Sequence, residues 1–191
     1  MGTKIKCFLL LPTEEGEVSF RRFVFSKEGA PCPCPSGYHD AEVVVGKCRF
    51  EPNSSVPDLV GYSEEPDRTD PRWPKKCSCG YEFREDDQWQ RNVRRLHDRD
   101  DGGPQTTIRK APPGAMWYAD WWSDKGPDGR CLAVKTPAGE WMVDGPSTNG
   151  KGWTRTGTPP NVTARPSIGI GKKDGGWVYH GFLTDGVLEE C

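Results

Sequence analysis

Two short cysteine units limit what this 191-residue chain can fold into more than any other feature. They lie at residues 32–34 (Cys-Pro-Cys) and 77–79 (Cys-Ser-Cys), and each separates its two cysteines by one residue. Pro33 stiffens the first unit, and Gly80 lets the chain turn back after the second. Four thiolates suit tetrahedral zinc, so the pattern predicts a Zn2+ ion on Cys32, Cys34, Cys77 and Cys79.

The spacing leaves alternatives open, because zinc knuckles usually have two residues between their cysteines and these units have one. His39 and Cys48 are substitute ligands, and in a further interpretation the cysteines are reduced thiols buried in turns. A shell of four cysteines would leave no open position for a substrate, which indicates a structural zinc rather than a catalytic one. The other cysteines are isolated: Cys7, Cys131 and Cys191.

The compartment and the charge narrow the classes of partner. No secretory leader and no long apolar span are visible, so we expect a cytoplasmic protein, and in a reducing cytosol clustered cysteines are typical of metal sites. A formal net charge of -2 gives no electrostatic footprint for nucleic acid and no polybasic attraction to a membrane. A protein partner or a peptide substrate is therefore the expected class of binding partner.

The pattern of apolar residues and turn formers predicts an α+β fold of mostly antiparallel strands. Glycine and proline together make 41 of the 191 residues, which favours many tight turns between short strands. Strands are expected at residues 4–11, 17–25, 41–50, 115–122, 131–136, 140–143, 167–170 and 177–183.

One amphipathic helix is expected over residues 85–97. Trp89, Val93 and Leu96 fall at i, i+4 and i+7, with acidic residues in the first turn and basic residues near the end. The composition changes near residue 105. We therefore expect a zinc-stabilised region over residues 1–105 and a tryptophan-rich β domain over residues 106–191, which share one core or form two.

Several motifs together resemble the BubE-like family of phage and bacterial proteins, in its long phage-borne form. The resemblance covers most of residues 28–188. It rests on seven motifs. Those of the first half are Cys-Pro-Cys-Pro (residues 32–35), Tyr-His-Asp-Ala (38–41) and Arg-Trp-Pro followed by Cys-x-Cys-Gly-Tyr-Glu-Phe (72–83). Those of the second half are Pro-Pro-Gly-Ala-Met-Trp (112–117), Gly-Pro-Asp-Gly-Arg (126–130), Pro-Ser-Ile (166–168) and His-x-Phe-Leu-x-x-Gly (180–186).

The resemblance implies two functions. Some members of the family stand beside ubiquitin-like conjugation genes in bacteria, where a peptidase role has been proposed. The recurrent polar pair corresponds to Ser167 and His180, which would form a serine-type peptidase or acyl hydrolase with Asp185 or Asp144 orienting the imidazole. Members in tailed phages imply the alternative, a non-enzymatic virion or assembly protein of the capsid or tail.

Purely structural roles are also consistent with the same residues. Ser167 follows a proline in what reads as a turn, and His180 precedes a glycine, so both side chains are equally suited to bonding loop backbone. Six tryptophans from residue 117 onward are suited to stacking a sugar or a base, but the pattern favours a packed core.

Overall fold

A computed structural model of the chain describes residues 2–25, 32–34, 37–52, 55, 57–59, 65–146, 153–171 and 176–191. These residues form β-strands, turns and a short 3-10 helix, η1 (Ile108–Lys110). Nearly all strand pairs are antiparallel, so the prediction of a mainly antiparallel β fold is confirmed. None of the helical segments in this described part is long and apolar enough to cross a membrane.

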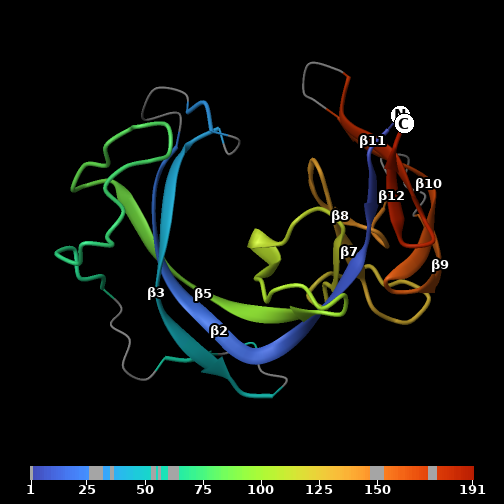
Figure 1. Cartoon of the computed structure of the whole chain (residues 1–191), viewed down its shortest axis with the longest axis horizontal. Helices are drawn as coiled ribbons and strands as arrows, with labels where there is room; N and C mark the ends of the chain where they lie inside the picture. The colour runs from blue at the N-terminus through green and yellow to red at the C-terminus, as the bar shows by residue number, and fades with distance from the viewer. Residues whose placement is uncertain are drawn as a thin grey trace. The chain divides into compact units, whose positions relative to one another are not determined.

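The chain forms two compact units. One comprises residues 13–96, and the other comprises residues 1–12 together with 97–191, whereas the sequence suggested a division between residues 105 and 106. The first strand joins the C-terminal unit because β1 (Lys4–Lys6) pairs with β12 (Val187–Glu190), which brings the two ends of the chain together (Figure 1). The long strands β2 (Phe8–Val24) and β5 (Gln88–Arg99) each continue from one unit into the other.

The C-terminal unit packs two sheets around its main core. One sheet has the order β1-β12-β11-β10-β9, in which β9, β10 and β11 span Thr154–Thr158, Asn161–Gly171 and Trp177–Thr184. The other joins β6 (Ala115–Tyr118), β7 (Leu132–Thr136) and β8 (Gly139–Met142), with β6 parallel to the start of β2. Both sheets supply the core: Met116, Leu132, Val134, Trp141, Val143, Val162, Ala164, Ile168, Tyr179, Leu183 and Leu188.

The unit of residues 13–96 is a sheet of β4 (Pro57–Asp58), β3 (His39–Phe50), β2 and β5. Strands β2 and β3 run antiparallel, so that Val24 at the end of β2 lies opposite His39 at the start of β3. A small core of Val18, Cys48 and Phe50 packs against Val93 of β5. Phe20, Val24 and Trp73 of the same unit are also buried.

The predicted helix over residues 85–97 is wrong, because this segment forms strand β5. Trp89 and Val93 are four residues apart, a spacing that places two side chains on one face of a helix and also on one face of a strand. Trp89 packs against Phe20 and Val93 against the small core, while Arg94 reaches the carboxylate of Glu42 on the opposite face. Pairing with β2 thus overrides the helical pattern.

A buried ion-pair network stabilises the loops of the C-terminal unit. The side chain of Arg155 is 1% exposed, and its Nε and Nη2 lie 2.9 Å from Asp144 and 2.6 Å from Asp128. The other carboxylate oxygen of Asp144 accepts the Leu132 N–H at 2.8 Å. Hydrogen bonding to Arg155 lowers the pKa of Asp128 to about 2. Both oxygens of Asp144 are therefore engaged by Arg155 and by the backbone.

The tryptophans of the C-terminal unit divide between core and surface. Trp117 is 1% exposed and Trp141 is 8% exposed, as the packing interpretation predicts. Trp121 and Trp122 lie instead on a loop, at 68% and 39% exposure. The side chain of Trp177 lies outside the described residues.

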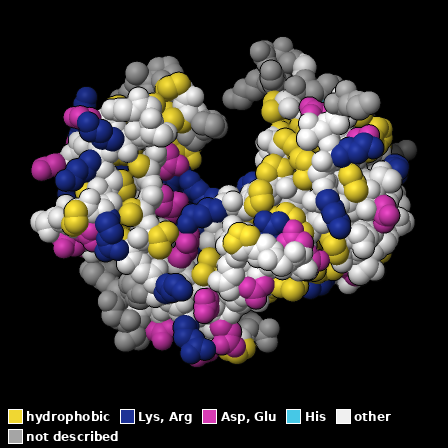
Figure 2. All heavy atoms as spheres, viewed as in Figure 1, with side chains coloured by type: hydrophobic (Ala, Val, Ile, Leu, Met, Phe, Trp, Pro, Cys, Tyr) yellow, Lys and Arg dark blue, Asp and Glu magenta, His cyan; other side chains and the backbone are white. Residues whose placement is uncertain are grey.

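The visible surface carries interspersed charges of both signs. Figure 2 shows Lys and Arg side chains alternating with Asp and Glu, with no large patch of one sign on this face. This distribution accords with a formal net charge of -2.

Candidate metal centre

Two segments far apart in the sequence bring sulfur atoms together in the unit of residues 13–96. Cys32 and Cys34 lie between β2 and β3, and His39 begins β3. Cys77 and Cys79 lie in a tight turn closed by the Cys77 N–H, which donates to the Tyr81 carbonyl at 2.8 Å. Gly80 has φ 93°, a left-handed conformation that suits glycine and lets this turn close.

The distances between donor atoms match those around a tetrahedral zinc ion. A Zn–S bond of about 2.3 Å places two sulfurs about 3.8 Å apart, and sulfur and imidazole nitrogen about 3.6 Å apart. Here Cys32 Sγ lies 3.9 Å from Cys77 Sγ and 3.6 Å from Cys79 Sγ, and His39 Nδ1 lies 3.3 Å from Cys79 Sγ. The ligand atoms of these four residues all lie within 4.8 Å of one another. The cluster therefore has the size and the donor chemistry that zinc requires.

Cys34 lies next to this set but does not belong to the mutually close group. Its Sγ is 3.7 Å from Cys77 Sγ and 3.1 Å from Ser78 Oγ, and the residue is half-buried. Cys48, the other predicted substitute, packs in the small core with Val18 and Phe50. Three of the four cysteines that the sequence singled out thus meet around His39, which the sequence offered only as a substitute.

Backbone N–H groups favour thiolates in this cluster. The N–H of Asp40 points at Cys77 Sγ at 3.4 Å, and that of Cys34 points at Cys32 Sγ at 3.4 Å. Burial acts to raise the pKa of Cys77, but hydrogen bonds from Cys79, Asp40 and Cys34 outweigh it and lower the pKa to about 6. Burial and the surrounding thiols raise the pKa of Cys32 to about 12. The lowered pKa of Cys77 favours its thiolate, and a divalent cation bound here would stabilise thiolates at the other cysteines.

A neighbouring aromatic ring orients the histidine. Tyr81 stacks on His39 with ring centroids 3.9 Å apart and an interplanar angle of 8°. This stack fixes the imidazole with Nδ1 toward Cys79, while Nε2 is buried and has no hydrogen-bond partner among the described residues. Tyr81 lies two residues after Cys79, but nothing in the sequence pattern marked it as a support for the site.

The predicted pair in the C-terminal unit also meets. Strands β10 and β11 are neighbours, and His180 Nε2 lies 3.2 Å from Ser167 Oγ. Both side chains are half-buried. Asp185 lies beyond the end of β11, about 15 Å along the strand from His180, and its backbone N–H bonds to Thr163 Oγ. The structure therefore joins the serine and the histidine but not either predicted aspartate.

Comparison with protein-family models, with curated proteins and with solved structures finds no match to this chain.

Proposed function

We propose that this chain is a zinc-stabilised binding protein in which one structural Zn2+ ion is held by Cys32, His39, Cys77 and Cys79. The observation that carries the proposal is the agreement of three donor-atom distances with the edges of a zinc tetrahedron. Four protein ligands close the coordination shell, so the ion serves folding rather than catalysis.

The ion would join segments that are far apart in the sequence. These are the cysteine segment before β3, the first residue of β3 and the turn at residues 77–80, and the ligands span 47 residues of sequence from Cys32 to Cys79. Closing so long a loop costs conformational entropy, which the metal–ligand bonds offset. The zinc would thereby order the segments that carry its ligands.

The setting proposed for this protein follows the BubE-like resemblance. We propose that it acts in the cytoplasm of a bacterial host cell or in a phage particle, and that its partner is another protein. A zinc-ordered unit beside a separately packed β unit suits a protein that presents binding surfaces in an assembly.

Metal content and cobalt spectroscopy test the zinc and its ligand set together. Protein purified without added metal is expected to contain about one zinc per chain. Substitution by Co2+ is expected to give a tetrahedral spectrum that changes in His39→Gln and stays the same in Cys34→Ser, because Cys34 lies outside the mutually close group.

Two outcomes would contradict the proposed zinc site or its ligand set. Absence of zinc from the wild-type protein would refute the metal site. A cobalt spectrum that loses thiolate charge-transfer intensity in Cys34→Ser and is unaffected in His39→Gln would replace the ligand set by four cysteines.

A second candidate function rests on the contact between His180 and Ser167. At 3.2 Å the imidazole can accept the hydroxyl proton as Ser167 Oγ attacks an acyl carbon, the minimum for a serine-type peptidase or other acyl hydrolase. Asp144 is engaged by Arg155. The candidate therefore rests on the contact between Ser167 and His180.

A serine-directed fluorophosphonate probe separates the dyad from a structural hydrogen bond. If Ser167 is activated, the probe is expected to label the wild-type protein once per chain, and labelling is expected to vanish in both Ser167→Ala and His180→Gln. The matched control is Ser123→Ala on a loop of the same unit, which is expected to keep full labelling. Wild-type protein that remains unlabelled would reduce the pair to a link between β10 and β11.

A further inference from the structure

One buried arginine of β2 bonds to both ends of the segment that carries Cys77 and Cys79. Arg22 is 5% exposed, and its Nη1 donates to the carbonyl of Pro74 at 3.2 Å. Its Nη2 donates to the carbonyl of Arg84. These two carbonyls lie on either side of the cysteine segment in the sequence. A single guanidinium therefore bridges the two ends of that segment.

The segment between the two carbonyls is a short hairpin. The N–H of Phe83 donates to the carbonyl of Lys75 at 2.9 Å, and Lys76 pairs with Glu82 in an antiparallel bridge. The tight turn of residues 77–80 follows directly on this bridge. Residues 75–83 thus form a cysteine hairpin, which carries two of the four proposed zinc ligands near its tip.

Arg22 supplies the hydrogen bonds that the backbone lacks at the base of the cysteine hairpin. Pro74 has no N–H to donate, and the N–H of Arg84 donates to the carboxylate of Asp87 at 2.6 Å. The carbonyls of Pro74 and Arg84 accept the guanidinium instead. Hydrogen bonds from an ionised donor are stronger than those between neutral groups, so this link fixes the hairpin firmly to β2.

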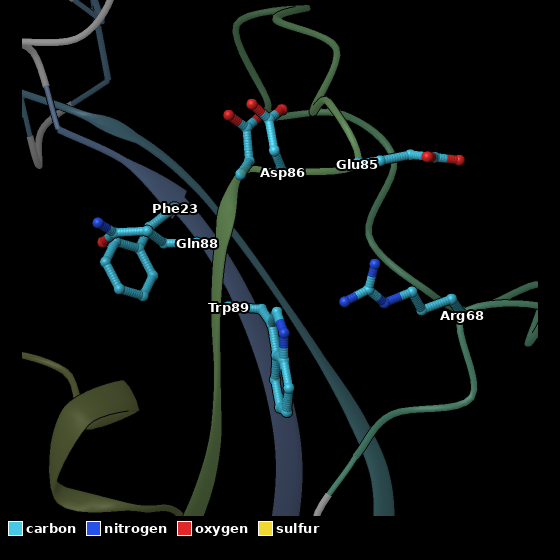
Figure 3. Close-up of a pocket in the computed structure, with 7 residues that line it drawn as sticks. Phe23, Arg68, Glu85, Asp86, Gln88 and Trp89 are labelled. Carbon is cyan, nitrogen blue, oxygen red and sulfur yellow. The ribbon is translucent and has the colours of Figure 1, made fainter.

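Aromatic rings hold the guanidinium in place. Its Cζ lies 5.5 Å from the ring centroid of Trp73 and 5.1 Å from that of Phe83, and Trp73 packs edge-on against Trp89. Figure 3 shows Trp89 on one side of the strands and Phe23 on the other. Successive side chains of a strand alternate, so Arg22 lies on the Trp89 side. Packing on that side therefore sets the position of the guanidinium.

The same strand also sets the position of the histidine. Arg22 and Val24 share one face of β2, and Val24 pairs with His39 at the start of β3. Strand β2 thus holds His39 through backbone pairing and holds the cysteine hairpin through Arg22. The two parts meet where His39 Nδ1 lies 3.3 Å from Cys79 Sγ. The spacing between the imidazole and the hairpin sulfurs therefore depends on both links.

We propose, on the basis of the zinc site proposed above, that Arg22 is a positioning residue for the metal. It fixes the cysteine hairpin against β2 so that Cys77 and Cys79 meet His39 at the spacing that zinc requires. Residues that orient metal ligands commonly contribute about 10- to 100-fold to metal affinity. Loss of the guanidinium would keep all four ligands in the chain but would let the hairpin shift relative to His39.

Zinc release from the zinc-loaded full chain tests the role of Arg22. In Arg22→Met, transfer of Zn2+ to an excess of a chelating dye is expected to be about 10-fold faster than in wild type. The tetrahedral spectrum of the Co2+-substituted protein is expected to shift, because the ligand geometry changes. Arg22→Lys is expected to release zinc at an intermediate rate, because an ammonium lacks the fork that bridges two carbonyls. The lysine variant also decides the question if Arg22→Met does not fold.

Arg94→Met is the matched control, because Arg94 is a half-buried arginine of the same unit that pairs with Glu42 on the opposite face of the sheet. It is expected to keep the wild-type rate of zinc release and the wild-type cobalt spectrum, even where it lowers the melting temperature. Wild-type release rates in both Arg22 variants, or equal acceleration in Arg94→Met, would overturn the proposal.

The cobalt spectrum separates positioning of the metal from a role in folding alone. Faster zinc release from the Arg22 variants with an unchanged cobalt spectrum would mean that Arg22 only stabilises the unit, which would also overturn the proposal. Wild-type protein that holds no zinc would refute the metal site itself. Zinc-loaded wild-type protein whose zinc release does not respond to Arg22 would refute the positioning role and leave the metal site standing.

Discussion

Replacement of Cys77 by serine is expected to release zinc and to lower the melting temperature of the residue 13–96 unit more than any other single change in it. Cys77 is 3% exposed, and its Sγ lies within 3.9 Å of the sulfurs of both Cys32 and Cys34. Structural zinc contributes on the order of 10 kcal/mol of binding free energy in small domains, comparable to the whole stability of a domain. A chelator is expected to have the same effect on the wild-type protein and little further effect on Cys77→Ser.

The matched control is Cys48→Ser, which also places a hydroxyl at a buried cysteine of the same unit but away from the cluster. This change is expected to lower the free energy of unfolding by about 1–3 kcal/mol, because it buries a hydroxyl. Zinc content and chelator sensitivity are expected to stay at the wild-type level. Metal analysis and thermal melts with and without chelator measure both effects. If Cys77→Ser kept its zinc, or if both variants behaved alike, the site would not be what stabilises this unit.

Replacement of Arg155 by methionine is expected to destabilise the C-terminal unit by about 3–5 kcal/mol. The side chains of Arg155 and Asp144 are 1% and 3% exposed, so removing the guanidinium leaves a carboxylate buried without its counter-charge. Denaturant unfolding measures the loss. Adding Asp144→Asn to Arg155→Met is expected to recover part of it, because an asparagine oxygen can still accept the Leu132 N–H without carrying a charge.

Arg130→Met serves as the comparison, because Arg130 forms the same kind of ion pair with Asp120 at the surface. The two side chains are 48% and 61% exposed, and such pairs contribute about 1 kcal/mol or less. Losses of similar size in Arg155→Met and Arg130→Met would mean that burial does not strengthen the Arg155 network.

The metal centre shows which of its ligands could be predicted from the sequence. The two Cys-x-Cys units predicted a cysteine cluster, and Cys32, Cys77 and Cys79 lie in it. The position of His39 could not be predicted, because it depends on the pairing that sets His39 opposite Val24 at the end of β2. The stacking of Tyr81 on the imidazole depends equally on the turn that brings Tyr81 back to β3.

The segment at residues 85–97 shows how a local pattern can predict the wrong secondary structure. A spacing of four between Trp89 and Val93 satisfies a helix and a strand alike, and acidic residues before a basic run are the usual sign of a helix start. The competing partner was β2, which is far away in sequence and pairs with β5. The same error misplaced Glu85 and Asp86, which belong to a turn that leads into the strand rather than to a helix.

Composition and spacing alone determined that this chain forms mainly antiparallel strands, that cysteines of its two Cys-x-Cys units come together, and that its net charge is close to neutral. These properties are local or additive, so they can be read without knowing which segments meet. Tertiary structure alone decided that His39 joins the sulfurs and that Ser167 meets His180. Each of these depends on strand pairing between distant segments, whose free energy comes from burial and hydrogen bonds that no local pattern contains.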